Sequence, residues 1–174
     1  MGGMGRRFDG GYAEYTCVPV DQVKVVNPAI KISWEQLGAL PEMMQTAWGS
    51  LFEALQIKKN DHLLIRGGTT SVGLAALALV KSMDLCTSVG ATTRQKGREA
   101  MLKENGADEV FIDDGSIANE VHKRKREGYS KILDLVGVTS LADSLLCAGE
   151  HGIVCVTGIV GGKVSSPRTR LMIQ

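Results

Sequence analysis

Residues 63–73, LLIRGGTTSVG, join an apolar run to a segment with helical periodicity, and this stretch decides the fold class of the chain. Aligned with the pattern G-x-G-x-x-G, it places Gly68, Thr70 and Gly73 at the three glycine positions. The first glycine permits a tight turn, and the last lets the helix pack closely against the strands. Thr70 stands where a glycine normally lets the backbone approach a pyrophosphate, so the loop departs from the pattern there.

Backbone N–H groups at the start of a helix bind anions, and hydroxyl groups in the same loop add donors. Because the stretch lies between a strand and a helix, it predicts a phosphate site for a dinucleotide. The candidate residues are Gly68, Thr69, Thr70, Ser71, Val72 and Gly73. A glycine-rich turn that binds no ligand is the alternative. The pattern G-x-x-x-x-G-K-[ST] does not occur in the chain, which argues against a nucleoside triphosphatase.

Apolar runs alternate with helical patterns from residue 61 onward. The predicted strands are residues 62–65, 85–91, 109–112, 131–136 and 152–157, and the predicted helices are residues 71–83, 94–105, 116–127 and 141–148. Gly106 and Gly149 stand where glycines that end helices are expected. The alternation predicts an α/β fold with a doubly wound, Rossmann-type parallel sheet over residues 61–163.

The end of the second predicted strand carries Thr92, Thr93 and Arg94. A domain that binds NAD usually has an acid there, which bonds the ribose 2′-hydroxyl. The first acid in this segment is Glu99, which lies on the following helix. Small hydroxyls and a cation instead suit a 2′-phosphate, with Arg94 and Arg98 as candidate contacts. The sequence therefore favours NADP over NAD, and a solvated helix start is the alternative for these basic residues.

The segment before residue 60 has a different pattern. Residues 12–18 and 22–26 read as two strands. Ser33 fits the N-cap of a helix, because the glutamine three residues later can reach back to it. Pro41 fits the first turn of a helix that ends at Leu55. We therefore expect a small separate piece of β structure, followed by helices.

The composition excludes several classes of protein. Hydrophobic residues make up 44% and charged residues 22% of the 174 residues, which is typical of a globular domain. The formal net charge of +1 argues against a nucleic-acid-binding protein. No apolar stretch approaches the roughly 20 residues of a membrane helix, and we find no signal peptide, so we expect a cytoplasmic protein. The four cysteines and three histidines are scattered, so neither disulfides nor a zinc site is predicted.

Together these features resemble the medium-chain dehydrogenase/reductase superfamily, which includes zinc-type alcohol dehydrogenases and quinone oxidoreductases. The resemblance covers about residues 5–163 and rests on residues 10–15, 40–41, 46–47, 67–74, 106–110, 133–137 and 152–158. It implies a remnant of the GroES-like catalytic domain at residues 1–32, hinge helices at 33–60, the Rossmann domain at 61–163 and a polar tail at 164–174. This tail does not resemble the family to us, and both ends of the chain are expected to be truncated.

The resemblance also implies where the nicotinamide half of the cofactor lies. The residues that it places near the nicotinamide and its ribose are Thr46, Val136, Gly137, Gly158 and Ile159. Ligands of doubly wound folds bind at the carboxyl edge of the sheet, where four of these residues are predicted to lie. Asp134 ends a strand at the same edge, and we expect it to cap a loop or a helix rather than to transfer a proton. No catalytic residue is assigned.

The predicted function is that of the nucleotide-binding domain of an NADP-preferring oxidoreductase. Such an enzyme transfers hydride between NADP(H) and a small-molecule substrate, which is an alcohol or carbonyl, an enone or a quinone. The zinc ligands of the alcohol dehydrogenase branch are not found in this chain. Because most of the substrate-binding wall is missing as well, we expect the isolated chain to be inactive.

A catalytically inactive dinucleotide-binding or assembly module is the alternative function. The family has a sixth strand that we do not find in this sequence. Without it, the fifth predicted strand is an open sheet edge, and open edges pair with other chains. This alternative predicts a homodimer. Neither function involves a nucleic acid or a membrane.

Overall fold

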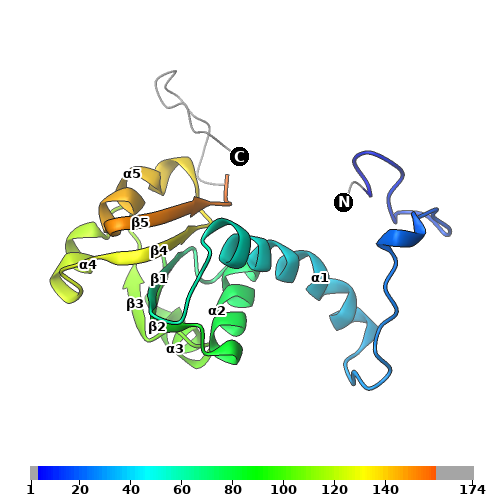
Figure 1. The fold of residues 1–174 in the computed structure, drawn as a ribbon, viewed down its shortest axis with the longest axis horizontal. Helices are drawn as coiled ribbons and strands as arrows, with labels where there is room; N and C mark the ends of the chain where they lie inside the picture. Colours follow the sequence, from blue (N-terminus) through cyan, green and yellow to red (C-terminus); the bar gives the residue numbers. More distant parts are fainter. Residues whose placement is uncertain (1–3, 160–174) are drawn as a thin grey trace. The chain divides into compact units, whose positions relative to one another are not determined.

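One five-stranded parallel sheet forms the centre of the computed structural model, which describes residues 4–159 (Figure 1). The strands are β1 (Asp61–Arg66), β2 (Cys86–Thr93), β3 (Glu109–Ile112), β4 (Tyr129–Asp134) and β5 (Ala148–Val156). Their order is β3-β2-β1-β4-β5, and every neighbouring pair is parallel. The sheet therefore grows outward from β1 in both directions. The switch point between β1 and β4 is where doubly wound folds bind their ligands.

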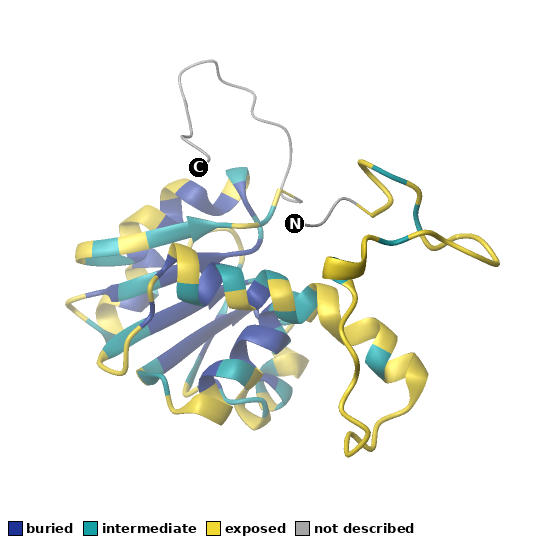
Figure 2. Ribbon diagram, turned by 45° about the vertical axis from the view of Figure 1, so that its right-hand side comes forward, coloured by how far each residue is buried: buried dark blue, intermediate teal, exposed yellow. Residues whose placement is uncertain are grey.

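Helices cover both faces of this sheet (Figure 1). They are α2 (Ser71–Met83), α3 (Glu99–Glu104), α4 (Ala118–Arg124) and α5 (Val138–Cys147), with a 3-10 turn, η3 (Lys96–Arg98), before α3. Successive side chains of a strand point to opposite faces, so Leu63 packs in one core cluster with Leu77, whereas Leu64 packs in a second with Val121. Strands β1 to β4 carry buried residues between these two layers, whereas the residues of β5 are partly or fully exposed (Figure 2). The predicted Rossmann-type fold is confirmed.

The predicted helix ends agree with the structure for some helices and not for others. The predicted range of α2 matches the structure, and Gly106, with φ at +113°, ends the helical segment before β3 as expected. The prediction that Gly149 ends a helix is wrong, because α5 stops at Cys147 and Gly149 lies within β5. Ala148 is already extended, with ψ at 139°, so the chain enters the strand without a left-handed residue.

The helix before the sheet, α1 (Trp34–Trp48), begins earlier than predicted and contains Pro41 in its interior. Ser33 and Gln36 form the expected capping box, since the Gln36 N–H donates to the Ser33 hydroxyl at 3.2 Å and the Gln36 amide oxygen accepts from the Ser33 N–H at 3.3 Å. Pro41 nevertheless removes one backbone hydrogen bond from the interior of the helix. A π-helical turn, η2 (Gly49–Ala54), follows α1 directly, so the predicted single helix to Leu55 changes its winding.

The first of two units into which the chain divides ends at Leu37. Before α1, its described part holds a 3-10 turn, η1 (Val20–Gln22), and an isolated bridge between Met4 and Phe8. The two strands predicted at residues 12–18 and 22–26 are therefore wrong. Their side chains explain this difference: Tyr12, Tyr15 and Val25 are almost fully exposed. Strand propensity is realised only where a partner strand and a buried face exist. The assignment of residues 1–32 to a catalytic-domain remnant stays a prediction.

No helix in the described ranges combines the length and the apolar character that a membrane crossing requires.

Candidate functional site

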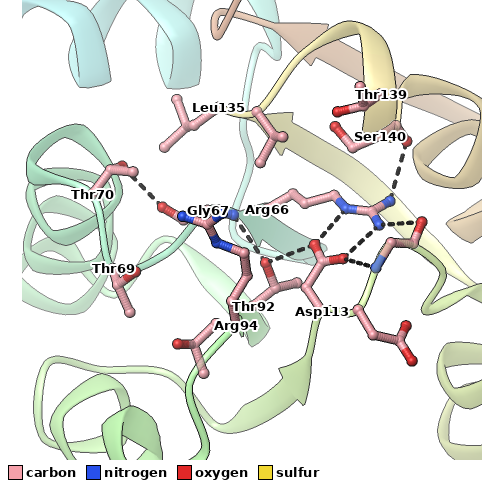
Figure 3. A pocket seen from close by; sticks show the side chains of 14 residues that line it. Arg66, Gly67, Thr69, Thr70, Thr92, Arg94, Asp113, Leu135, Thr139 and Ser140 are labelled. Carbon is pink, nitrogen blue, oxygen red and sulfur yellow. Dashed lines mark hydrogen bonds and ion pairs between the residues drawn. The ribbon is translucent and has the colours of Figure 1, made fainter. Parts of the chain in front are cut away.

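A cavity of about 620 Å³ opens at the carboxyl ends of the strands, beside the switch point between β1 and β4 (Figure 3). Six of the predicted site residues line it: Thr69, Thr70, Thr92, Thr93, Arg94 and Val136. Eight further lining residues were not predicted: Arg66, Gly67, Asp113, Asp114, Gly115, Leu135, Thr139 and Ser140. The cavity thus joins the loop before α2 to the ends of β2, β3 and β4.

The tight turn of the loop is made by Gly67, whose φ is +82°, and not by Gly68 as the sequence alignment suggests. Gly68 is needed for space, because a Cβ there would lie 3.0 Å from the Cβ of Ala91. At Gly73 a Cβ would lie 2.7 Å from the carbonyl oxygens of both Gly67 and Gly68. The start of α2 therefore packs against the loop as closely as the predicted role of the last glycine requires.

Thr70 is the N-cap of α2, a role that explains its place in the glycine pattern. Its hydroxyl accepts from the Gly73 N–H at 3.1 Å and donates to the Gly67 carbonyl at 2.9 Å. Its single hydroxyl proton is thereby used inside the loop, so the expectation that it donates to a phosphate does not fit. The backbone N–H groups of Thr69, Ser71 and Val72 donate to no acceptor among the described residues. They are the donors that this helix start leaves for an anion.

The hydroxyls at the end of β2 also have partners within the protein. Thr92 is buried and accepts from the Gly67 N–H at 2.9 Å, which ties β2 to the loop. The Thr93 hydroxyl accepts from the Gln95 N–H at 3.2 Å. Arg94 is exposed, lines the cavity and is available to a ligand. Arg98 lies on η3 and is not among the residues that line the cavity.

The residue that sequence reasoning missed is Arg66, the last residue of β1, whose side chain has no exposed surface. Its guanidinium bonds both oxygens of Asp113, from Nε at 2.8 Å and from Nη2 at 3.0 Å (Figure 3). Its Nη1 bonds Asp143 on α5 at 2.7 Å. The sequence does place this arginine directly after an apolar run, which indicates a buried cation. A buried cation requires a buried anion as its partner. The sequence does not say which of 19 acidic residues supplies it.

Arg66 stabilises each of the two carboxylates, and they stabilise Arg66, against the cost of burial. Burial alone would raise the pKa of Asp113, but the hydrogen bonds and the charge of Arg66 lower it below the usual aspartate value. Burial would likewise raise the pKa of Asp143, but the N–H of Ile117, the hydroxyl of Ser116 and the charge of Arg66 lower it. Burial would lower the pKa of Arg66, and the two carboxylates raise it instead. All three groups are therefore charged at neutral pH.

Asp134 has the capping role that was expected of it. Its fully buried carboxylate accepts from the N–H groups of Val136 and Gly137, each at 2.9 Å, and from the hydroxyls of Ser140 and Ser144. These donors belong to the turn before α5 and to α5 itself. With its acceptor positions filled, Asp134 holds the helix start and does not line the cavity.

The residues expected near the nicotinamide lie around the ends of β4 and β5, and only Val136 among them lines the cavity. A Cβ at Gly137 would lie 2.3 Å from the Gly158 carbonyl oxygen, so the two glycines let neighbouring turns touch. Ile159 is exposed. Thr46, on α1, accepts from the Ser50 hydroxyl at 2.8 Å through its carbonyl oxygen.

Ser50 in turn joins η2 to the sheet. Its hydroxyl lies 2.9 Å from that of Thr157, which directly follows β5. Because the Ser50 hydroxyl also donates to the Thr46 carbonyl, the Thr157 hydroxyl supplies the proton of this second bond. The last part of α1 is thus tied to the carboxyl edge of the sheet.

The described residues give no metal site and no reactive thiol in the core. Among residues 4–159 no three His, Cys, Asp or Glu side chains group closely enough to hold a metal ion, so the side chains present do not fit a zinc ion. Burial raises the pKa of Cys86 and of Cys147 to about 12, so these thiols are protonated at neutral pH and are poor nucleophiles. The free N–H groups of the loop and the exposed Arg94 are suited to an anionic ligand.

In a comparison with known families, the family model described as zinc-binding dehydrogenase matches residues 71–174. The match continues to the last residue, so the expectation that residues 164–174 do not resemble the family is wrong. Our reading of the tail relied on its polar, basic composition, which is a weaker signal than a whole-family pattern. The structure of these residues lies outside the described ranges, as does the 160–163 part of the predicted domain.

Individual proteins give the same picture. The quinone oxidoreductase of Homo sapiens is 28% identical over 165 residues, which are 92% of this chain and 48% of that protein. The crystal structure of AibC is 29% identical with a TM-score of 0.64, over 70% of this chain and 34% of the other. A mycobacterial structure complexed with NADPH is 22% identical with a TM-score of 0.71, over 78% of this chain and 42% of the other. This chain therefore spans about half the length of the curated relatives that it matches.

Proposed function

Because the chain belongs to the zinc-binding dehydrogenase family, we propose that it is the coenzyme-binding part of an NADP-preferring oxidoreductase. The resemblance of its motifs to the medium-chain dehydrogenase/reductase superfamily is confirmed by this membership. An NAD(P)-dependent oxidoreductase domain follows from the family and its relatives. The preference for NADP, the substrate and the activity of the whole protein are our proposals.

The observation that carries the preference is the end of β2, which presents a cation to the cavity. Arg94 is exposed and lines the cavity, whereas Thr92 and Thr93 use their hydroxyls inside the protein. No carboxylate of β2 is available for a ribose 2′-hydroxyl, because the strand has the sequence CTSVGATT. A guanidinium recognises a phosphate through two parallel hydrogen bonds, so Arg94 suits the 2′-phosphate of NADP. Arg98, further along the chain, is proposed as a second and weaker contact.

The loop before α2 supports binding of the pyrophosphate. The three N–H groups of Thr69, Ser71 and Val72 supply donors at the positive end of the α2 dipole. The glycines at positions 68 and 73 keep the backbone of this loop close to β2 and α2. This arrangement holds an anion without any charged side chain in the loop itself.

We place the nicotinamide half of the cofactor at the ends of β4 and β5. The residues proposed to flank it are Thr46, Val136, Gly137, Gly158 and Ile159. The bond between Ser50 and Thr157 supports this placement, because it holds the end of α1 at the same edge. When bound, NADPH supplies the hydride, and the residues of this chain position it. The proposed substrates are alcohols or carbonyls, enones and quinones, since one relative is a quinone oxidoreductase.

A titration of the chain with NADPH and with NADH tests the proposal. Reduced nicotinamide accepts energy from excited tryptophan, so binding near Trp48 quenches the fluorescence. We expect NADPH to bind at least roughly tenfold more tightly than NADH, because one charge-assisted phosphate contact contributes about 1.4 kcal/mol or more. Arg94→Ala should abolish this preference, and Lys96→Ala, which removes a neighbouring exposed charge outside the cavity lining, should keep it. Equal affinity for both cofactors would refute the NADP preference.

An assembly role is the second candidate function, and the position of β5 favours it. Among the described strands β5 has a neighbour only on the side of β4, and its Ile153 is 40% exposed. Sedimentation over a range of protein concentrations tests this role. A dimer that Ile153→Lys dissociates would support edge pairing, and a monomer at the highest concentration would rule it out.

The cytoplasmic location expected from the sequence also remains a proposal. All four cysteines are free, although Cys86 and Cys155 are partly accessible. Free thiols are typical of a reducing compartment.

A further inference from the structure

Arg66 and Asp113 form part of the cavity wall, Asp143 lies behind them, and stability alone does not account for this buried cluster. All the strong hydrogen bonds of the guanidinium go to carboxylates that lie 47 and 77 residues away in the sequence. Buried ion pairs are often no more stabilising than apolar side chains of the same size, because each charge loses its hydration. The three residues before Arg66 on β1, at positions 63–65, are apolar and fully buried. The charge at position 66 therefore calls for an explanation in the cavity.

The cluster is connected to the loop that we propose to hold the pyrophosphate. Asp113 accepts from Arg66 and also lies 3.4 Å from the Thr92 hydroxyl, which donates to it. With its proton directed at Asp113, Thr92 offers a lone pair to the Gly67 N–H at 2.9 Å. A single chain of hydrogen bonds thus runs from Arg66 through Asp113 and Thr92 to the residue with the left-handed turn (Figure 3).

The cluster also fixes the turn after β3, which closes the cavity on that side. Asp113 accepts from the Gly115 N–H at 3.0 Å, and Arg66 donates to the Gly115 carbonyl at 3.4 Å. Asp143 accepts from the N–H groups of Ile117 and Ala118 at the start of α4. Arg66 and its two carboxylates therefore hold the ends of β1, β2 and β3 against α4 and α5.

The charges of the cluster also affect how well the cavity accepts an anionic ligand. The cavity lining contains two carboxylates, Asp113 and Asp114, and a dinucleotide with a 2′-phosphate brings several negative charges to it. Like charges in a poorly hydrated site repel strongly. Arg66 pairs with both oxygens of Asp113 and offsets its charge, while Asp143, which does not line the cavity, bonds the guanidinium through Nη1. Without Arg66, the same carboxylate would face an anionic ligand with no cation beside it.

We propose that Arg66 is a positioning residue for the adenosine half of the cofactor: it neutralises Asp113 and, through Asp113 and Thr92, sets the shape of the phosphate loop. In doubly wound folds the first three strands hold the adenosine half, and the cluster lies at the ends of those strands. The inference rests on the proposed function, since it concerns the same cavity. It adds that a buried ion pair, and not only the glycine loop, determines how tightly an anion binds.

Calorimetric titration with adenosine 2′,5′-bisphosphate, which contains the adenosine and the 2′-phosphate without the nicotinamide, tests this inference. Arg66→Met should weaken its binding by about tenfold or more, because Asp113 then repels it. Asp113→Asn in the Arg66→Met background should restore most of the affinity, since the unpaired charge in the cavity lining is gone. Asp143 also loses Arg66, but it does not line the cavity and keeps the N–H groups of Ile117 and Ala118 as donors. Arg124→Met removes an arginine that is ion-paired with Glu120 outside the cavity, and it should leave the affinity unchanged.

Recovery of affinity on adding Asp113→Asn distinguishes two explanations, which are repulsion of the ligand by Asp113 and a purely structural role of Arg66. A role of Arg66 in folding alone predicts no recovery when Asp113→Asn is added to Arg66→Met. An unchanged affinity of a folded Arg66→Met chain, or the absence of rescue, would overturn the inference.

A second variant decides the matter if Arg66→Met does not fold. Asp113→Asn alone keeps an acceptor for Arg66 and for Thr92 but leaves the cation less compensated. It should bind the bisphosphate more tightly, by a factor that falls as salt is added. Unchanged or weaker binding would contradict the inference. If the unaltered chain binds neither NADPH nor the bisphosphate, the proposed function itself is wrong, and the inference falls with it.

Discussion

Two sides of the same cavity are built by different physical means. On the side of α2, backbone geometry dominates: Gly67 supplies a positive φ, and Gly73 allows contact between the helix and two carbonyl oxygens. On the side of β3, the wall is held by charge, with Arg66 between Asp113 and Asp143. The first side depends on residues that are neighbours in the sequence, and the second on residues far apart. One cavity can thus be held in shape both by close backbone packing and by buried ion pairs. Substitutions on each side can measure the two contributions separately.

The largest effect is expected on the charged side. Asp143→Ala leaves Arg66 with one carboxylate and removes the acceptor of two N–H groups at the start of α4. The free energy of unfolding should fall by about 4 kcal/mol, because uncompensated buried groups are costly. Urea unfolding at pH 7 measures it. Lys59→Ala breaks an ion pair whose side chains are about four-fifths exposed, and it should leave the free energy of unfolding nearly unchanged. Similar losses of unfolding free energy in the two variants would show that the buried cluster stabilises the fold no more than an exposed ion pair does.

The next effect is expected on the backbone side. Gly73→Ala places a Cβ 2.7 Å from the carbonyl oxygens of Gly67 and Gly68, which belong to a backbone that cannot yield easily. We expect a loss of about 3 kcal/mol, together with weaker binding of NADPH, as the loop moves away from α2. Gly97→Ala is the matched control, because a Cβ there meets nothing within 4 Å. If Gly73→Ala is as stable as the control, the close packing is not needed.

The sequence allowed the backbone side to be predicted in part. A glycine whose added Cβ would overlap a carbonyl leaves a local pattern, so Gly68 and Gly73 were found, although the positive φ was assigned to the wrong residue. The N-cap role of Thr70 follows from its own hydroxyl, and the departure from the pattern hid it. The alternation of strands and helices gave the sheet, because each apolar run faces two layers of helices.

The charged side could not be predicted, because its pairings are properties of the fold. Arg66 meets Asp113 only after β1 and β3 are placed in one sheet, and it meets Asp143 only after α5 packs against that sheet. The strands expected before residue 27 failed for the same reason. Their residues have the propensity of strands, but the described unit that contains them supplies no partner strand. Both the ion pairs and the strand pairing depend on contacts between residues far apart in the chain, and a single sequence does not reveal these contacts.

A smaller loss of stability is expected at low pH. It concerns only the charged side of the cavity, because that side depends on ionised carboxylates. The pKa of Asp113 and that of Asp143 are lowered below the usual 3.8 by the partners described above. A lowered pKa in the folded state means that the unfolded chain binds protons first as the pH falls. The contribution of the cluster is therefore fully present above about pH 5, and it is lost as the pH falls below 3.8 toward the folded-state values.

Urea unfolding between pH 7 and pH 3 measures this loss. The unaltered chain should be equally stable between pH 6 and pH 8, as far as these two carboxylates are concerned. Asp113→Asn removes one of them, so its stability should fall less steeply in acid. Equal slopes for the two chains would show that the pKa of Asp113 is not lowered by folding.

The smallest effect is expected at Thr70, and it tests whether the side chain of this loop serves the helix or the ligand. Thr70→Ala removes the N-cap of α2, so the free energy of unfolding should fall by about 1 kcal/mol. Affinity for NADPH should change little once the chain is folded, because the hydroxyl proton is bonded to the Gly67 carbonyl. Thr70→Ser keeps the hydroxyl and should retain the stability. A loss of affinity in Thr70→Ala that Thr70→Ser restores, without a loss of stability, would mean that the hydroxyl turns to the phosphate when the cofactor binds. In that case the two sides of the cavity would differ less than the hydrogen bonds of Thr70 indicate.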